Sequence, residues 1–443
     1  MRRSPRILAT AALVAAFPVL GPPPATADTP ASGTFRALTY NIAGLPEGIS
    51  SAPTPRRPAT TAIGRRIGPF DLVNVQEDFN YHAYLYAADS HAHRTPTTGG
   101  AGLGSGLNSL SHQPFGDLDR ITWNDCFIGS GDCLTPKGFT FHRVRLAEGA
   151  YLDVYNLHAD AGSESGDEAA RRANLAQLTS YIGTHSAGGA VLIMGDTNTR
   201  YTRTGDRIAQ FAADNGLTDA WVRLARGGTA PAPGSPALTC PDTAPGIACE
   251  VVDKILYRSS RLLTLTATRY ANLDADFRDG GGAKLSDHFP IAADFTWTRN
   301  PAYQASDQFG GPHGASFTDI DRVPAGARAA TISLRAGSRV DQVGVTLDNG
   351  TSLTHGGTGG TADSLTLAAG EYVTSVRLCQ GQKDGRTRIF HARFTTSHSR
   401  VLEGGTTTSD CVTRTAPAGW RLAGFHGRSG AEVDKLGFIY TAR

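Results

Sequence analysis

A series of short apolar segments, each ending in a polar or charged residue, limits the folds open to residues 34–297. Phe70 to Gln76 is a near-continuous apolar run, which is typical of a strand buried on both faces. Helical spacing over residues 56–69 and 164–183 separates such segments. Strands that alternate with helices and hairpins predict a layered α/β domain. The other predicted strands are residues 34–42, 139–145, 151–157, 190–194 and 251–257.

Six segments place polar side chains at or near a strand end, where an open α/β sheet presents them to a cleft. Each has an ordinary interpretation alone: a glutamate at a strand end is solvated, a single histidine is structural, and Gly-Asp-x-Asn forms a turn. Together they form a pattern far more specific than its parts. The segments are Thr39-Tyr40-Asn41, Val75-Gln76-Glu77, Tyr155-Asn156-Leu157-His158, Met194-Gly195-Asp196-Thr197-Asn198, Val252-Asp253-Lys254 and Leu285-Ser286-Asp287-His288-Phe289-Pro290.

This order of segments resembles the endonuclease/exonuclease/phosphatase superfamily, the DNase I-like phosphodiesterases, over about residues 34–297. The resemblance implies an α/β four-layer sandwich with two central sheets. It also implies a metal-dependent phosphoric diester hydrolase. A phosphodiester repels nucleophiles, and a hard cation with oxygen ligands neutralises its charge. Mg²⁺ is the expected cofactor, with Mn²⁺, Co²⁺ or Ca²⁺ as alternatives.

The resemblance assigns a role to each polar residue at these strand ends. Glu77 matches the family's metal ligand, with Asn41 beside it, and Asp287 binds a second metal or holds the site by hydrogen bonds. Histidine is the natural base near neutral pH, which suits His288. The remaining expected catalytic residues are Asp253, which fixes the tautomer of His288; Asp196, which orients water; Asn198, which holds a phosphoryl oxygen; and His158, which stabilises charge or protonates the leaving oxygen.

Three segments resemble the neutral sphingomyelinase branch of this superfamily. Lys137-Gly138-Phe139 resembles its K-G-x-x-[YF] strand, Asn41 to Pro46 its N-x-x-x-L-P start, and Cys249 to Asp253 its tract ending in L-D-Y. Residues 269–282 depart from the pattern because they are polar, where secreted bacterial sphingomyelinases often carry an aromatic-tipped hairpin. The expected substrate is a phospholipid head-group diester, or another phosphodiester such as a soluble head-group diester. A secreted nuclease and a lectin-type binding protein with an inert enzyme domain are the alternatives.

Three further residues are candidates for substrate binding. Lys137 could contact phosphate or be a surface lysine. Arg200 and Tyr201 follow the Gly-Asp-x-Asn segment and suit phosphate recognition, although a solvated loop is the favoured interpretation. Mature residues 28–299 carry 24 basic and 28 acidic side chains, a net charge of −4. A duplex DNA binder usually has a basic footprint, so nucleic acid is a partner only under the nuclease alternative.

Near residue 300 helical patterns give way to short alternating strands and glycine-rich turns. Residues 337–345, 370–378 and 430–438 are alike, which predicts a pseudo-repeated all-β unit. Residues 307–443 resemble the jacalin-like lectins, and the implied fold is a β-prism that binds surface carbohydrate. A prism that has lost sugar binding is the alternative. The implied sugar-site residues are Gly311 of the opening Gly-Gly turn and Gly430, Ala431, Glu432, Val433 and Asp434 of a G-x-x-x-D loop.

The first 27 residues have the features of a secretory signal peptide. A positive start precedes an apolar run from Ile7 to Leu20, and Ala25-Thr26-Ala27 offers a cleavage site. Secretion permits disulfides, and six cysteines allow 15 connectivities. Pairing each cysteine with its neighbour along the chain gives Cys126–Cys133, Cys240–Cys249 and Cys379–Cys411, which keeps every bridge within one domain, and a zinc site is the alternative. The expected organisation is a signal peptide (1–27), a phosphodiesterase domain (28–299) and a lectin domain (300–443), released to the extracellular space without an integral membrane segment.

Overall fold

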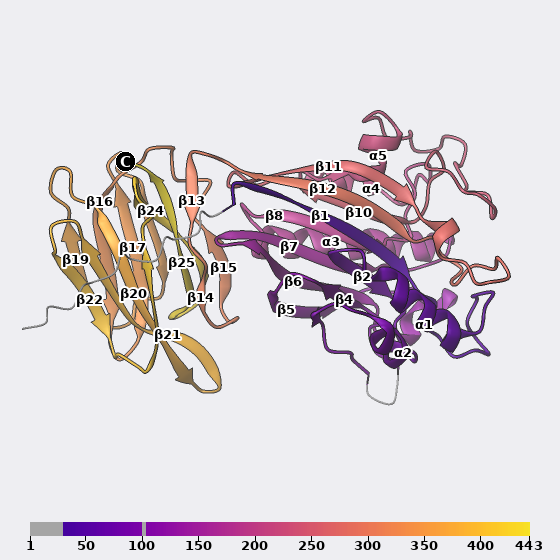
Figure 1. Cartoon of the computed structure of the whole chain (residues 1–443), viewed down its shortest axis with the longest axis horizontal. Helices are drawn as coiled ribbons and strands as arrows, with labels where there is room; N and C mark the ends of the chain where they lie inside the picture. The colour runs from indigo at the N-terminus through magenta and orange to yellow at the C-terminus, as the bar shows by residue number, and fades with distance from the viewer. Residues whose placement is uncertain (1–29, 100–102) are drawn as a thin grey trace, which may run out of the picture.

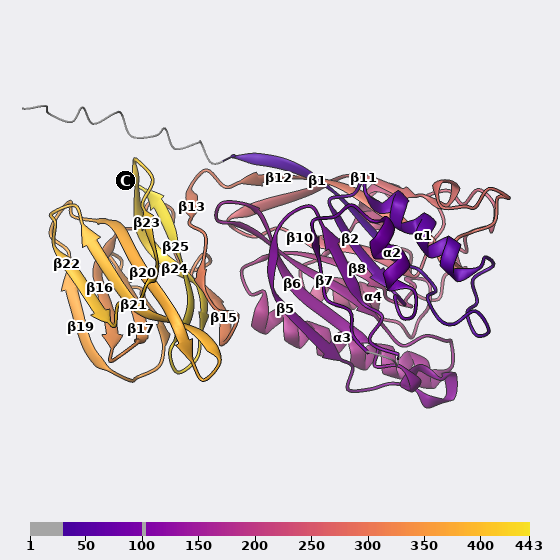
Figure 2. The same cartoon turned by 60° about the horizontal axis from the view of Figure 1, so that its bottom comes forward.

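The computed structural model describes residues 30–99 and 103–443 and shows two folded bodies joined end to end (Figures 1 and 2). The predicted signal peptide lies outside the described residues. Strands and helices of residues 32–299 build the larger body, and residues 303–442 build an all-β body. Within the described ranges no helix is long and apolar enough to cross a bilayer.

Two six-stranded sheets form the centre of the larger body. The first sheet runs, in spatial order, β11 (Leu263–Asn272), β12 (Ile291–Arg299), β1 (Ser32–Asn41), β2 (Leu72–Gln76), β4 (Asn108–Ser111) and β3 (His93–Arg94). The second runs β5 (Phe115–Thr122), β6 (Gly138–Ala147), β7 (Ala150–His158), β8 (Ala190–Asp196), β10 (Asp253–Arg258) and β9 (Thr218–Asp219).

Side chains alternate along each strand, so each sheet has an inner face toward the other sheet and an outer face. Helices cover the outer faces of both sheets. On β1, Leu38 and Tyr40 pack in a cluster with α1 and α2, whereas Phe35 and Ala37 join the core shared by the two sheets. Leu178 of α3 packs in that larger cluster from the other side. The predicted four-layer α/β sandwich is therefore confirmed. The helices are α1 (Arg56–Ile67), α2 (His82–Ala88), α3 (Ser165–His185), α4 (Ile208–Asp214) and α5 (Ala220–Ala225).

Amide side chains join the sheets across their buried interface. Gln76 Nε2 donates to Asn156 Oδ1 at 2.7 Å. Asn74 Nδ2 donates to the carbonyls of Tyr155 and Met194 at 3.0 and 3.2 Å. Buried amides that keep their partners fix the register of one sheet on the other, since losing a partner inside a core costs about 1–3 kcal/mol.

The all-β body is a prism of three sheets around one apolar core, which confirms the predicted β-prism. The three similar sequence segments include the first residues of β17, β20 and β25, and each of these strands lies between two others in a different sheet. The first sheet runs β13 (Tyr303–Ala305), β25 (Val433–Ala442), β24 (Trp420–Ser429) and β15 (Ala315–Thr318), and β14 (Phe309–Gly310) also pairs with β25. The second sheet runs β18 (Ser352–Gly356), β17 (Val340–Leu347), β16 (Ala329–Ala336) and β19 (Thr361–Thr366). The third sheet runs β22 (Val401–Gly405), β21 (Arg386–Thr396), β20 (Val373–Lys383) and β23 (Asp410–Thr415).

The cysteines form the three expected pairs, and none of the described cysteines is free. After β2, the segment from Tyr81 to Tyr84 leads into α2. His91 is buried and bonds the carboxylate of Asp89 and the carbonyl of Phe70.

Partly buried charge contacts join the two bodies. Asp307 accepts hydrogen bonds from Arg145 Nε, the Gly149 backbone amide and the Tyr151 hydroxyl, at 2.9–3.0 Å. Asp117 on β5 pairs with Lys435 on β25. The contact at Asp307 therefore lies at the start of β7, and β7 extends away from the all-β body.

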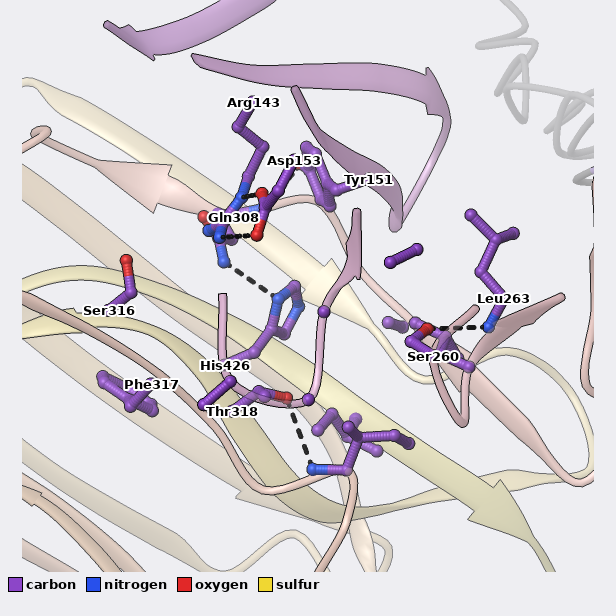
Figure 3. Close-up of a pocket in the computed structure, with 18 of the residues that line it drawn as sticks. Arg143, Tyr151, Asp153, Ser260, Leu263, Gln308, Ser316, Phe317, Thr318 and His426 are labelled. Atoms are coloured by element: carbon purple, nitrogen blue, oxygen red, sulfur yellow. Dashed lines mark hydrogen bonds and ion pairs between the residues drawn. The ribbon is translucent and has the colours of Figure 1, made fainter. Parts of the chain in front are cut away.

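A cavity of about 70 Å³ remains between the bodies (Figure 3). Arg143 and Asp153 pair on its catalytic-domain side, with Nε and Oδ1 2.6 Å apart. On the prism side, Gln308 Nε2 lies 2.9 Å from His426 Nδ1. Burial lowers the pKa of His426 to about 4, so this ring stays neutral and takes part in the interface as a hydrogen-bonding group.

We expect Asp307→Asn to weaken this interface by about 1–3 kcal/mol, because three donors lose a shared charged acceptor. Differential scanning calorimetry would show the prism and the larger body unfolding further apart in temperature. Asp348→Asn is the matched control, since Asp348 pairs with Arg328 at 3.6 Å on the surface, where ion pairs contribute little. Identical thermograms for the two variants would contradict the assignment.

Candidate active site

The strand ends singled out in the sequence meet at one edge of the sandwich. Asn41 is paired with Gln76 in a parallel register, and His158 with Asp196 in another. Asp253 begins β10 directly opposite Asp196. Because parallel strands end at the same sheet edge, these registers bring both sheets' polar residues together.

Asn41 lies at the centre of this edge. Its amide nitrogen donates to Glu77 Oε1 at 3.0 Å and to Asp196 Oδ2 at 3.1 Å. Its amide oxygen accepts from the backbone nitrogen of Ala43 at 3.0 Å. Asn41 thus links a carboxylate of the first sheet to one of the second. Burial raises the pKa of Glu77 and of Asp196 above the ordinary carboxyl range.

His288 faces the same centre. Its Nδ1 lies 3.0 Å from Asp253 Oδ2, and its Nε2 lies 3.6 Å from Asp196 Oδ2. The preceding Ser286 hydroxyl donates to the Asn41 carbonyl at 2.7 Å and fixes this loop on β1. Burial lowers the pKa of His288, but the Asp253 and Asp196 carboxylates outweigh it and raise the pKa well above 6.5. A carboxylate on Nδ1 leaves Nε2 as the reactive nitrogen.

His158 and Asn198 complete the cluster. His158 Nε2 lies 3.4 Å from Asp196 Oδ2, and burial together with the charge of Lys137 holds the His158 pKa well below 6.5. Asn198 donates from its side chain to the Ala159 carbonyl at 3.1 Å. Its backbone nitrogen donates to Asp196 Oδ1 at 3.0 Å. The structure therefore brings Asn41, Glu77, His158, Asp196, Asn198, Asp253 and His288 together.

Three residues just beyond strand ends adopt left-handed backbone conformations without being glycine. Ala43, Glu77 and Asn198 have φ of 48°, 54° and 50°. Such residues cost about 1–3 kcal/mol each and persist where the surroundings demand them. Gly44 allows the turn after β1, because a Cβ there would lie 2.3 Å from the Glu77 carbonyl oxygen. The chain thus spends stability to aim Glu77 and Asn198 into the cluster.

The donor set of this cluster fits a hard divalent cation. Glu77, Asp196, Asp253 and Asp287 supply carboxylate oxygens, and the Asp253 Oδ1 atom is buried without a hydrogen-bond partner among the described residues. Asp196, Asp253 and His288 have ligand atoms within 4.8 Å of one another. Asp287 is more exposed, and its Oδ2 accepts from the Ser51 hydroxyl. Oxygen-rich, acidic donor sets of this kind suit Mg²⁺ or Ca²⁺.

The three candidate substrate residues fall in different surroundings. Lys137 pairs with Asp132, and its charge acts on Glu77, His158 and Asp196. Arg200 donates from Nη1 to the Glu250 carbonyl. Tyr201 is buried in the core, with its hydroxyl 3.0 Å from Asp219 Oδ2. Lys137 therefore lies near the cluster, Arg200 is hydrogen-bonded to the backbone, and Tyr201 packs in the core.

The implied sugar site of the prism is formed as one compact unit. The backbone nitrogen of Gly311 donates to the Asp434 carbonyl at 2.9 Å, and a Cβ on Gly311 would lie 2.5 Å from the Thr387 carbonyl oxygen. Asp434 Oδ1 accepts from Arg388 Nη1 at 2.8 Å. Glu432 accepts from Arg339 and Lys383, and these hydrogen bonds lower its pKa to about 2. The loop Gly430, Ala431, Glu432, Val433 and Asp434 is thus held by cations that the sequence pattern did not reveal.

We expect Asp253→Asn to lower the pKa of His288, because it removes the carboxylate nearest the ring. NMR titration of the histidine Nε2 and Nδ1 resonances would measure the shift. Asp276→Asn, at an exposed position in a neighbouring loop, is the control and should leave the titration unchanged. An unchanged His288 titration in Asp253→Asn would refute the ion pair.

Comparisons with known proteins match each of the two bodies to a protein family. The model for Endonuclease/Exonuclease/phosphatase family 2 matches residues 60–232, and that for the jacalin-like lectin domain matches residues 306–439. A sphingomyelinase of Mycobacterium tuberculosis is 44% identical over 271 residues, which are 60% of this chain and 53% of that protein. The chain thus spans about half the length of these sphingomyelinases. Horcolin of Hordeum vulgare is 29% identical over 137 residues, 30% of this chain and 92% of horcolin.

Solved structures are similar to each body separately. Sphingomyelinase C from Streptomyces griseocarneus is 18% identical and covers 59% of this chain and 99% of its own, with a TM-score of 0.43. Malaysian banana lectin is 25% identical and covers 32% and 99%, with a TM-score of 0.29. The sequence comparisons therefore show an endonuclease/exonuclease/phosphatase domain, similar to that of the sphingomyelinases, fused to a jacalin-like lectin domain.

Proposed function

We propose that this protein is a secreted, divalent-metal-dependent phosphodiesterase that hydrolyses a phospholipid head-group diester, as a phospholipase C or sphingomyelinase does. We further propose that the lectin domain directs it to surface carbohydrate, with domain limits of 28–299 and 300–443. The observation that carries the proposal is the pairing of His288 with Asp253 on one side of the cluster and Asn41 with Glu77 and Asp196 on the other.

The cluster's side chains suit attack by water on phosphorus. With its ring neutral, His288 Nε2 takes a proton from water while Asp253 holds the ring by Nδ1 and stabilises the imidazolium. Asp196 orients the water, and the water oxygen attacks phosphorus opposite the leaving alcohol oxygen. As the new P–O bond forms, the P–O bond to the alcohol breaks, the leaving oxygen takes up a proton from solvent, and the imidazolium then returns its proton to solvent. His158 and Asn198 stabilise the charge that develops on the phosphoryl oxygens by hydrogen bonding.

Glu77 and Asn41, with Asp287 nearby, would hold the divalent cation. When bound there, the cation neutralises the phosphate's negative charge and thereby lowers the barrier to nucleophilic attack. The strained backbone of Glu77 and the hydrogen bond from Asn41 keep its carboxylate in place before any substrate binds.

Surface features favour a lipid interface over nucleic acid. Ile128 and Leu134, in the loop that precedes Lys137, are 67% and 74% exposed, and Ile49 is 65% exposed beside the loop that bonds Asp287. Exposed large apolar residues beside a cleft suit a membrane surface. The negative net charge of residues 28–299 opposes duplex binding. The relatives named sphingomyelinase support the same choice.

Secretion has independent support from the cysteines. Three disulfides persist in an oxidising compartment and are rare in reducing ones. The signal-like leader adds to this support.

We expect the mature chain to release phosphocholine from sphingomyelin vesicles in Mg²⁺ and to lose that activity in EDTA. His288→Ala should lower kcat by roughly 10²- to 10⁴-fold, the usual contribution of a general base. His398→Ala, an exposed histidine of the prism, is the matched control and should be unaffected. Plasmid DNA is assayed in parallel. Nicked DNA without head-group release would establish the nuclease alternative instead.

We expect Asp434→Asn to weaken glycan binding by about tenfold or more, since a charged hydrogen-bond acceptor contributes about 1.5–3 kcal/mol. Glycan-array binding and hydrolysis of plain vesicles would be measured together, and hydrolysis should not change. Asp363→Asn, on the exposed strand β19, is the control. If the wild-type chain binds no glycan, the prism is a spacer and the targeting proposal fails, while the hydrolysis result still stands.

A further inference from the structure

A second acidic cluster lies apart from the catalytic one. Asp132, Asp160 and Asp167 each offer a carboxylate oxygen, and these oxygens lie within 4.8 Å of one another. All three side chains are more than nine-tenths buried, with residue exposures of 6%, 1% and 0%. They come from a 3₁₀ turn (Asp132–Leu134), the segment just after β7, and the first turn of α3.

Hydrogen bonds satisfy only part of this cluster. Asp167 accepts from the Ser130 hydroxyl and from the Glu164 backbone nitrogen. Asp160 Oδ2 accepts from the Phe127 backbone nitrogen at 2.8 Å. The other oxygens, Asp160 Oδ1 and Asp132 Oδ2, are buried and have no partner in the described part of the chain. A buried carboxylate oxygen without a partner is costly and requires an explanation.

The positive charges nearby do not supply that explanation. Lys137 pairs with Asp132 through its other oxygen, Oδ1. Arg171 is close by, but its Nη1 donates to the carbonyls of residues 160–162 and its Nε to Asp206 Oδ1 at 2.9 Å. Three buried carboxylates therefore face one ammonium group. Buried charges are stable when they are paired or coordinate a metal.

We propose that Asp132, Asp160 and Asp167 bind a structural divalent cation of the calcium type. Ca²⁺ takes six to eight oxygen ligands in flexible geometry, which suits carboxylates contributed by three separate segments. A pocket of about 340 Å³ lined by Asp132, Asp160 and Lys137 gives the cation and its waters an entry path. The site shares no residue with Glu77, Asn41 and Asp287, so it does not depend on the proposed function.

The bound cation holds a loop against the catalytic edge. Asp132 belongs to the loop closed by the Cys126–Cys133 disulfide, which precedes Lys137. Asp160 follows Ala159, whose carbonyl accepts from Asn198 Nδ2 at 3.1 Å. Joining Asp132 to Asp160 and Asp167 therefore fixes Lys137 and the exposed Ile128 and Leu134 relative to β7 and α3.

Terbium luminescence and thermal unfolding would test the site in the full mature chain. Trp123 lines the same pocket and is the sensitiser for bound Tb³⁺. The wild-type chain should show Trp-sensitised Tb³⁺ emission that Ca²⁺ displaces, and a Tm that rises with Ca²⁺. Asp132→Asn and Asp160→Asn should each weaken the competing Ca²⁺ affinity of the sensitised site at least tenfold and remove the part of the Tm rise that this site contributes. Glu77→Gln, which alters the other candidate cation site, is the control and should keep the sensitised emission and its displacement by Ca²⁺.

Folding of the variants is checked on the metal-free proteins. Each asparagine variant should unfold at or above the temperature of the metal-free wild type, because it removes buried like-charge repulsion. If one variant fails to fold, the other carries the test. The proposal is overturned if the wild type shows no sensitised emission, or if the folded variants keep wild-type emission and the same Ca²⁺-dependent Tm.

Discussion

The side chain of Asn41 joins the two sheets at the edge where the active site forms. Its nitrogen donates to Glu77 at the end of the first sheet and to Asp196 at the end of the second. The buried Gln76–Asn156 hydrogen bond continues this connection into the core. Because both sheets are fixed by amide hydrogen bonds, carboxylates that repel one another stay close together around one histidine.

Strand β7 contacts the prism near its first residue and ends in the catalytic cluster. The backbone nitrogen of Gly149, just before β7, donates to Asp307 of the prism, and His158 ends β7 in the catalytic cluster. A nine-residue strand spans about 30 Å at roughly 3.3 Å per residue, so the prism adjoins the far end of the sandwich (Figure 1). The prism therefore leaves the cluster uncovered.

Sequence alone predicted strands β1, β2, β6, β7, β8 and β10 and the polar residues of the cluster, because each of these polar residues lies at or near the end of a recognisable apolar run. It did not predict the edge strands or the spatial order of the strands. It did not show how Asn41 is used, since an amide's hydrogen-bond partners depend on the register between sheets. Tyr201 looked like a substrate residue from its place after Asn198, but its ring packs in the core. Local sequence shows which residues lie at a strand end, but it does not show in which direction their side chains point.

The contacts that escaped prediction join distant segments. Arg388 reaches Asp434 from strand β21, across a separation of 46 residues, and no local pattern marks that pairing. The Asp132, Asp160 and Asp167 cluster likewise draws on three segments with no shared motif. Such sites follow from tertiary packing, whereas the catalytic motifs are short and contiguous.

Hydrolysis of sphingomyelin in ¹⁸O-labelled water tests the central claim most directly. If the cluster activates water for attack on phosphorus, the ³¹P resonance of the released phosphocholine will show one ¹⁸O atom per turnover, and ceramide will carry none. Absence of head-group release under Mg²⁺, or label in the lipid alcohol instead of the phosphate, would contradict the account.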